Sequence, residues 1–141
     1  MTGSPSRLVR EFHERCDLAR ADKPGPIDNA LACSRQRLLE EEVDELAEAV
    51  QAGRLPEIAR ELADVVYVAY GTAITYGIDL DAVLAEVHRA NLSKLGPDGR
   101  PVIRSGKVQK GEWFRPPDVA AVLQRQTATA TATATRDDST G

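Results

Sequence analysis

The sequence has few of the features that mark secreted, disulfide-bonded or membrane proteins. Its 141 residues include two cysteines, Cys16 and Cys33, whose separation matches no metal-binding or disulfide motif. No apolar run approaches the roughly 18 residues that a membrane span requires, and the N-terminal stretch has no apolar signal-peptide core. We therefore expect a soluble, cytoplasmic protein with two free thiols and no membrane partner.

Positive charge is also scarce. The 18 Lys and Arg residues are outnumbered by 22 Asp and Glu residues, which gives a formal net charge of −4. A nucleic-acid surface needs a basic patch, so no nucleic-acid partner is expected. The Gly-rich phosphate loop and the dinucleotide-binding fingerprint are both missing from the sequence. If the protein binds phosphate groups, it must therefore do so without either of these two motifs.

Apolar residues recur at helical spacing through most of the chain and predict an all-α protein. Asp28 or Asn29 can cap the second helix, which is expected to end at Ala52 before Gly53. Pro- and Gly-containing segments separate the helices. The four expected helices cover residues 5–20, 29–52, 57–76 and 79–95.

The chain is expected to form one all-α domain over residues 1–117, ending in a Gly-, Pro- and base-rich arm at 96–117. Residues 118–141 form a tail that we expect to be disordered from about residue 127, where a low-complexity Thr/Ala repeat begins. The third helix is apolar on nearly all sides after Asp64. This apolar surface is larger than a single small helical bundle can cover. We therefore expect a four-helix module assembled as a dimer of helical bundles, or as a higher homo-oligomer.

Two acidic pairs lie on the second and third expected helices. Glu42 and Glu45, like Glu61 and Asp64, are three residues apart, which puts each pair on one helix face. If these helices pack side by side, the four carboxylates converge and repel one another unless cations separate them. Mg²⁺, with Mn²⁺ as a substitute, prefers such oxygen ligands. The alternative for Asp64 is a salt bridge to an arginine such as Arg60.

Carboxylates that bridge a metal, with no Cys, Ser or His nucleophile beside them, indicate water as the attacking group and a phosphoanhydride as the bond broken. Glu41, about 100° around the helix from Glu42, is the candidate general base, and Glu40 is the alternative. His13 is a further candidate for substrate contact, although a lone His on a helix flank is more often structural. His88 is ambiguous.

Amide and basic side chains elsewhere form a candidate substrate-binding group. Asn91 interrupts the apolar stripe of the fourth helix and Lys94 lies three residues further on, an arrangement that suits phosphate oxygens. Lys94 equally suits the negative end of the helix dipole. Further candidates are Arg37, before the acidic run, and Lys107 and Lys110 in the arm at 96–117, which could close over a polyanionic ligand. A solvated surface role is the alternative for these three.

The motif Glu41-Glu42-x-x-Glu45, followed by Glu61-x-x-Asp64, resembles the signature of the MazG-like, all-α nucleoside triphosphate pyrophosphohydrolases. The resemblance to the phosphoribosyl-ATP pyrophosphohydrolase-like branch extends over roughly residues 8–117. It rests on the order of the segments REFH, LLEEEVDEL, IARELADVVYV, GIDLDAVLAEVHRANLSKL and GKVQKG. The Thr/Ala tail has no counterpart in the family pattern.

The resemblance implies a dimer that hydrolyses a nucleoside triphosphate or its deoxy form to monophosphate and pyrophosphate with Mg²⁺, in nucleotide-pool sanitation or control. It also implies roles for individual residues: Glu42, Glu45, Glu61 and Asp64 bind metal, Glu41 activates water, and Asn91 and Lys94 contact substrate. Two alternatives remain. One is a phosphoribosyl-ATP pyrophosphohydrolase, and the other is a non-catalytic, metal-binding helical dimerisation module.

Overall fold

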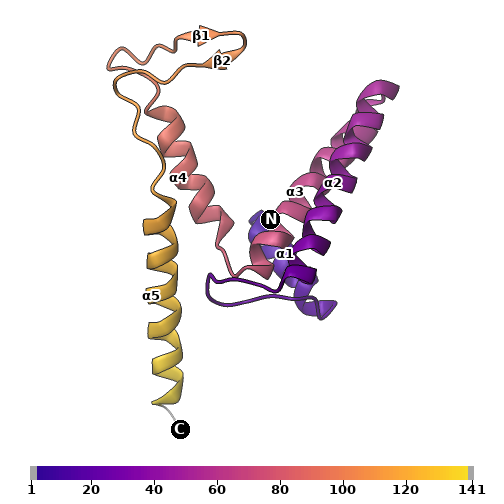
Figure 1. The fold of residues 1–141 in the computed structure, drawn as a ribbon, viewed down its shortest axis with the longest axis vertical. Coiled ribbons are helices and arrows are strands. Elements are labelled where there is room, and N and C mark those ends of the chain that lie inside the picture. The colour runs from indigo at the N-terminus through magenta and orange to yellow at the C-terminus, as the bar shows by residue number, and fades with distance from the viewer. Residues whose placement is uncertain (1–2, 140–141) are drawn as a thin grey trace.

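The structure, a computed structural model, describes residues 3–139 as five helices and one small β-hairpin (Figure 1). The all-α prediction is confirmed. Within the described residues, no helix combines the length and hydropathy needed to cross a membrane. The elements are α1 (Pro5–Arg15), α2 (Asn29–Ala52), α3 (Leu55–Thr75), α4 (Leu80–Leu92), β1 (Ile103–Arg104), β2 (Lys107–Val108) and α5 (Val119–Asp138).

The helices form two arms that diverge from the turn between α3 and α4 (Figure 1). In one arm α2 packs along α3, and α1 packs on the α4-proximal part of α3. In the other arm α5 begins next to α4, contacts it and extends away from it, and the hairpin lies at the opposite end of α4. Across residues 3–139, α2 and α4 make no contact with each other. The acidic and the basic candidate residues therefore lie in different arms.

The predicted bounds of α2 are confirmed, whereas α1 is shorter than expected. The Asp28 carboxylate accepts a hydrogen bond from the Leu31 amide at 2.9 Å and caps α2. The α1 helix ends at Arg15 rather than near residue 20, because Asp17 adopts a left-handed conformation with φ of 50°. The amide of Leu18 then bonds back to the carbonyl of His13 at 2.8 Å and closes the helix.

The turn between α3 and α4 depends on Gly77. This residue has a φ of 74°, and a Cβ atom there would collide with the Lys23 carbonyl. Asp79 caps α4 through the Ala82 amide, and the Tyr70 hydroxyl donates to the Asp81 carboxylate at 2.9 Å. These contacts fix the point from which the two arms diverge.

The core of the first arm surrounds a buried polar junction. Val9, Tyr70 and Ile74 form the apolar cluster, with Leu80 packed against it. Beside them His13 is buried, and burial lowers its pKa. Its Nδ1 lies 3.0 Å from the Ala19 carbonyl oxygen, to which it donates. The structural role that we considered for His13 therefore fits its position.

Arg35 of α2 crosses the same junction. Its Nη2 donates to the Val68 carbonyl at 3.0 Å, and its Nε donates to the Thr72 hydroxyl at 3.2 Å. Gly71 makes this approach possible, because a Cβ atom there would lie 2.5 Å from Arg35 Nη2 and 2.9 Å from His13 Nε2. Arg35 thus joins α2 to α3 through one backbone carbonyl and one side-chain hydroxyl of α3.

The Thr/Ala tail, for which we expected disorder, forms part of α5 in the structure, and this helix continues to Asp138. Asp118 caps this helix through the Ala121 amide at 3.0 Å. Alanine has the highest helix propensity, and each of five threonines in the repeat donates its hydroxyl to the carbonyl four residues back. These are Thr127, Thr129, Thr131, Thr133 and Thr135. The arm at 96–117 also contains unexpected structure, a hairpin with a Ser105–Gly106 turn at φ of 50° and 73°.

Glu86 connects α4 to the segment that begins α5. Its carboxylate accepts hydrogen bonds from the Arg89 guanidinium, at 2.8–3.2 Å, and from the Asp118 amide, at 2.9 Å. The bonds from Arg89 first, and from Asp118 second, lower the pKa of Glu86 to about 2. The Ser93 hydroxyl accepts from the Arg115 amide at 2.8 Å and strengthens the same connection.

We expect this connection to make stability depend on pH. Because the pKa of Glu86 is lower in the folded state, its ionised form stabilises the protein above the unfolded-state pKa of about 4.3. That stabilisation is lost as the pH falls toward 2. The Glu86→Gln variant should therefore have a lower urea midpoint than the wild type at about pH 6, and the difference should shrink toward about pH 3.

Glu11→Gln is the matched control, because Glu11 pairs with Arg15 at 2.9 Å on an exposed helix face and surface pairs contribute little. Its midpoint should follow the wild type at both pH values. A difference between wild type and Glu86→Gln that stays constant from neutral to acid pH would contradict the assignment.

Candidate active site

The pairing of α2 with α3 brings three glutamates together. The chain reverses within two residues after α2, where Gly53 has a φ of 68°, so that α2 and α3 run antiparallel in contact. The small side chain of buried Ala49 does not hold the two helices apart. One carboxylate oxygen from each of Glu42, Glu45 and Glu61 lies within 4.8 Å of the other two. We call these three residues the carboxylate cluster.

Two oxygen atoms of the carboxylate cluster are buried and have no hydrogen-bond partner among residues 3–139. They are Glu42 Oε2 and Glu61 Oε2, and the Glu61 side chain as a whole is 5% exposed. Buried polar atoms are normally hydrogen-bonded, and an unpaired acceptor calls for an ion or water. Hard divalent cations bind carboxylate oxygens. The donor set therefore fits such a cation.

The electrostatics of the carboxylate cluster agree with this fit. Loss of solvation raises the pKa of Glu42, and the negative charges of its acidic neighbours raise it further. The pKa of Glu45 is also raised, by loss of solvation and then by the closeness of the Glu61 carboxyl group. The ionised cluster is thus destabilised on its own at neutral pH, and positive charge placed among its oxygens would relieve the repulsion.

Asp64 lies beside the carboxylate cluster rather than within it. The three-residue group does not include Asp64, although its charge contributes to the raised pKa of both Glu42 and Glu45. The salt bridge that we considered between Arg60 and Asp64 is not formed. Arg60 instead pairs with Glu61, with Nη2 2.6 Å from Oε1. This adjacent pair was not anticipated, and its signal in the sequence is an arginine immediately before Glu61.

The two candidate bases differ in their contacts. Glu40 accepts a hydrogen bond from Gln36 at 3.0 Å on the exposed face of α2. Glu41 is also exposed, and its charge is one of those that raise the pKa of Glu42. Of the two, Glu41 is therefore the residue electrostatically coupled to the carboxylate cluster.

A depression of about 490 Å³ opens next to the carboxylate cluster, between the end of α2 and the start of α3. Charged side chains of both signs and two alanines line it, and the space is open to solvent on one side. This mixture suits a polar, charged ligand better than an apolar one. The lining residues are Glu45, Glu48, Ala49, Ala52, Arg54, Glu57, Arg60 and Glu61.

The candidate substrate-binding residues are only partly brought together. Asn91, Lys94 and Lys107 line one hollow of about 430 Å³ where the end of α4 meets the hairpin. That hollow lies in the other arm from the carboxylate cluster (Figure 1). Lys110 lies over the Phe114 ring, 5.0 Å from its centroid. Arg37 is exposed on α2 and lines neither the hollow nor the depression.

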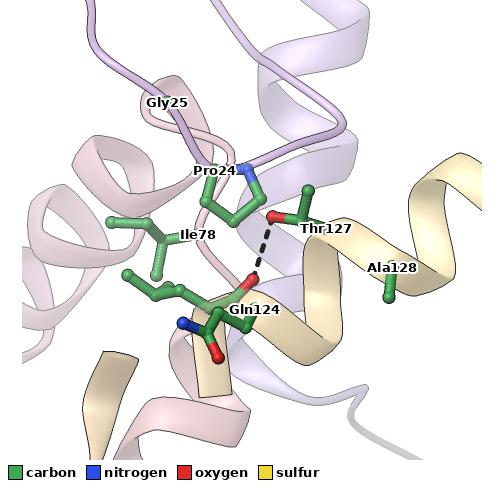
Figure 2. Close-up of a pocket in the computed structure, with 7 residues that line it drawn as sticks. Pro24, Gly25, Ile78, Gln124, Thr127 and Ala128 are labelled. Atoms are coloured by element: carbon green, nitrogen blue, oxygen red, sulfur yellow. Dashed lines mark hydrogen bonds between the residues drawn. The ribbon is translucent and has the colours of Figure 1, made fainter. Parts of the chain in front are cut away.

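A larger hollow, of about 640 Å³, has no charged residue in its lining. It lies where α5 passes the loop after α1, and Pro24 and Ile78 face Thr127 across it (Figure 2). The Thr127 hydroxyl is already bonded to the Leu123 carbonyl at 3.0 Å. Without acid, base or metal ligands this hollow has no means to catalyse hydrolysis, so the carboxylate cluster remains the candidate active site.

Comparison with known proteins places this chain in a family. Residues 9–91, more than half of the chain, match the family described as phosphoribosyl-ATP pyrophosphohydrolase. A 67-residue stretch is 37% identical to the uncharacterized protein L479 of Acanthamoeba polyphaga mimivirus, over 48% of this chain and 24% of that protein. The chain thus spans about a quarter of the length of that relative. The matched region contains all of α2 and α3 together with α4 as far as Asn91. This chain belongs to the phosphoribosyl-ATP pyrophosphohydrolase family, within the MazG-like all-α nucleoside triphosphate pyrophosphohydrolases, and the family indicates a pyrophosphohydrolase activity.

Proposed function

We propose that the protein hydrolyses a phosphoanhydride bond of a nucleotide and releases pyrophosphate and a nucleoside monophosphate unit. The observation that carries this proposal is the carboxylate cluster. One oxygen from each of its residues lies within 4.8 Å of the other two, and two of the cluster's oxygens are buried without a hydrogen-bond partner in the described structure. The family match supports the same reaction class.

In this reaction the chain provides ligands and a base. The carboxylate cluster, with Asp64 beside it, would hold Mg²⁺ or Mn²⁺, which neutralises phosphate charge and lowers the pKa of a bound water. Water oxygen forms a bond to phosphorus while the P–O bond between the α and β phosphates breaks. Glu41 accepts the proton from the water. Glu41 suits this role because it is exposed next to Glu42 and its charge contributes to the raised pKa of Glu42.

Two substrate classes share this chemistry. Canonical or modified nucleoside triphosphates and their deoxy forms would make the enzyme one of nucleotide-pool sanitation or control. Phosphoribosyl-ATP is the second class, and it is the substrate that the description of the matched family names. Phosphoribosyl-ATP carries an additional ribose phosphate on its adenine base, so the pocket around the base and not the carboxylate cluster must distinguish the two classes.

A substrate panel tests the proposal. The full chain is incubated with Mg²⁺ or Mn²⁺ and each of the canonical and modified (d)NTPs, or with phosphoribosyl-ATP, and the products are separated by chromatography. Pyrophosphate release from any of them supports the proposal, and the preferred substrate selects between the two classes. Cation-dependent thermal stabilisation with no turnover of any substrate would favour a non-catalytic, metal-binding dimerisation module instead.

Substitutions should separate metal binding from proton transfer. Glu42→Gln and Asp64→Asn should weaken cation binding and lower kcat together, by about 100-fold or more. Glu41→Gln should keep the cation affinity of the wild type and lose about 10²- to 10⁴-fold in kcat. Titration calorimetry with MnCl₂ and steady-state kinetics measure the two quantities.

Glu40→Gln is the matched control for the base, because it changes the neighbouring exposed glutamate of the same helix. It should retain most of the activity. If Glu40→Gln is inactive while Glu41→Gln keeps its rate, the base is Glu40.

A second copy of the chain is proposed to complete the site. Leu62, Val66 and Tyr67 of α3 are 39–50% exposed, and they line an apolar groove of about 350 Å³ together with Leu8. Exposed apolar surface of this kind favours association, and a symmetric dimer is the commonest form. The hollow lined by Asn91, Lys94 and Lys107, here called the basic hollow, lies in a different arm from the carboxylate cluster. In a dimer, the basic hollow of one copy would bind the substrate whose phosphates lie at the carboxylate cluster of the other copy.

Mixing two inactive variants tests this sharing. Glu42→Gln loses the metal site and Lys94→Ala loses the basic hollow, so each alone should be inactive. After the mixed chains are unfolded and refolded together, half of the dimers should be mixed, and each should contain one intact site, giving about a quarter of wild-type activity. No recovery, in a sample that light scattering reports as dimeric and mixed, would mean that each site is built from one chain.

A further inference from the structure

Arg60 differs from the other arginines of the candidate site in the partner that it contacts. Its guanidinium binds one oxygen of Glu61, with Nη2 at 2.6 Å and Nε at 3.2 Å from Oε1. The Arg60 side chain is 70% exposed, whereas that of Glu61 is 5% exposed. An arginine at the surface thus reaches a carboxylate that is buried between α2 and α3.

The two oxygens of Glu61 have separate environments. Both hydrogen bonds from Arg60 reach Oε1. Oε2 is buried and has no hydrogen-bond partner in the described structure. A carboxylate is planar, so when the exposed Arg60 guanidinium holds Oε1, the direction in which Oε2 points is fixed as well. Arg60 can therefore remain on Oε1 while Oε2 is available as a ligand.

Arg54 provides an internal comparison, because it lines the same depression at the start of α3. It pairs with Glu57 at 2.8 Å, and both side chains of that pair are well exposed, at 66% and 41%. Exposed pairs of this kind contribute little. A pair whose carboxylate is buried is different, since that carboxylate has lost its water and depends on the partner that remains.

We propose that Arg60 is a positioning residue for the metal site, one that holds Glu61 Oε1 so that Oε2 is presented to a divalent cation. This inference rests on the proposed function, which requires a cation at the carboxylate cluster. Groups that orient a metal ligand through hydrogen bonds commonly change cation affinity by 10- to 100-fold when they are removed. Within residues 3–139, Arg60 is the only Lys or Arg that forms an ion pair with the carboxylate cluster or Asp64.

The sign of the effect distinguishes positioning from simple charge. Removal of a positive charge near a cation site would, through charge alone, tighten the binding of a cation. Loss of an orienting hydrogen bond would weaken it. A weaker cation affinity after removal of Arg60 is therefore an effect that electrostatic repulsion cannot produce.

The test is calorimetric titration of the full chain with MnCl₂, in the absence of nucleotide, for the wild type and three variants. Arg60→Met should raise the Kd for Mn²⁺ about tenfold. Arg60→Lys keeps the charge but not the two-donor fork, so its Kd should lie between those of Arg60→Met and the wild type. Arg54→Met, the matched control, should bind within about twofold of the wild type. Circular dichroism verifies that helix content is unchanged.

An Arg60→Met variant that binds Mn²⁺ as tightly as the wild type would overturn the inference, and one that binds more tightly would mean that Arg60 competes with the cation. Both outcomes leave the proposed function intact. A wild-type protein that binds no Mn²⁺ would instead overturn the metal site itself, and the role of Arg60 with it.

Discussion

Repulsion among carboxylates held by two packed helices is the interaction on which the rest of this structure depends. Glu42 and Glu45 come from α2 and Glu61 comes from α3, and their oxygens are closer to one another than unscreened negative charges favour. Burial and mutual repulsion raise the pKa of Glu42. The free energy of folding must offset this cost when no cation is present, so the helix pair has to be held together elsewhere.

The junction at the other end of the helix pair provides that support. Arg35 of α2 donates to the backbone and a side chain of α3, and it fits because Gly71 has no Cβ atom. His13 is packed beside it from α1. Removing only one partner from such a buried polar junction would leave the others unsatisfied. The free energy gained at the Arg35 junction thus offsets the repulsion within the carboxylate cluster. Proteins commonly compensate in this way for an unfavourable functional site.

The sequence was sufficient for the features that depend on local rules. The bounds of α2 follow from a capping aspartate and from Gly53, and the acidic pairs share helix faces because three residues make nearly one turn. The convergence of Glu42, Glu45 and Glu61 required one further assumption, that the two helices pack side by side. The roles assigned to the individual carboxylates remain proposals.

Other features depend on backbone conformation and tertiary contacts that the composition of a segment does not reveal. The Thr/Ala repeat reads as low complexity, yet alanine favours a helix and the threonine hydroxyls find acceptors within it, and Glu86 anchors the start of α5 through the Asp118 amide. The early end of α1 depends on the left-handed conformation of Asp17. The separation of Lys94 from the carboxylate cluster is set by the direction of α4 after Gly77. That direction follows from tertiary packing and not from residue spacing.

A bound cation can be located directly by anomalous scattering from crystals of the full chain grown with Mn²⁺. We expect an anomalous peak among the carboxylates of Glu42, Glu45 and Glu61, with oxygen ligands at about 2.0–2.6 Å. A fully occupied Mn²⁺ site elsewhere in the molecule, with no peak at these three residues, would contradict the assignment of the carboxylate cluster as a metal site.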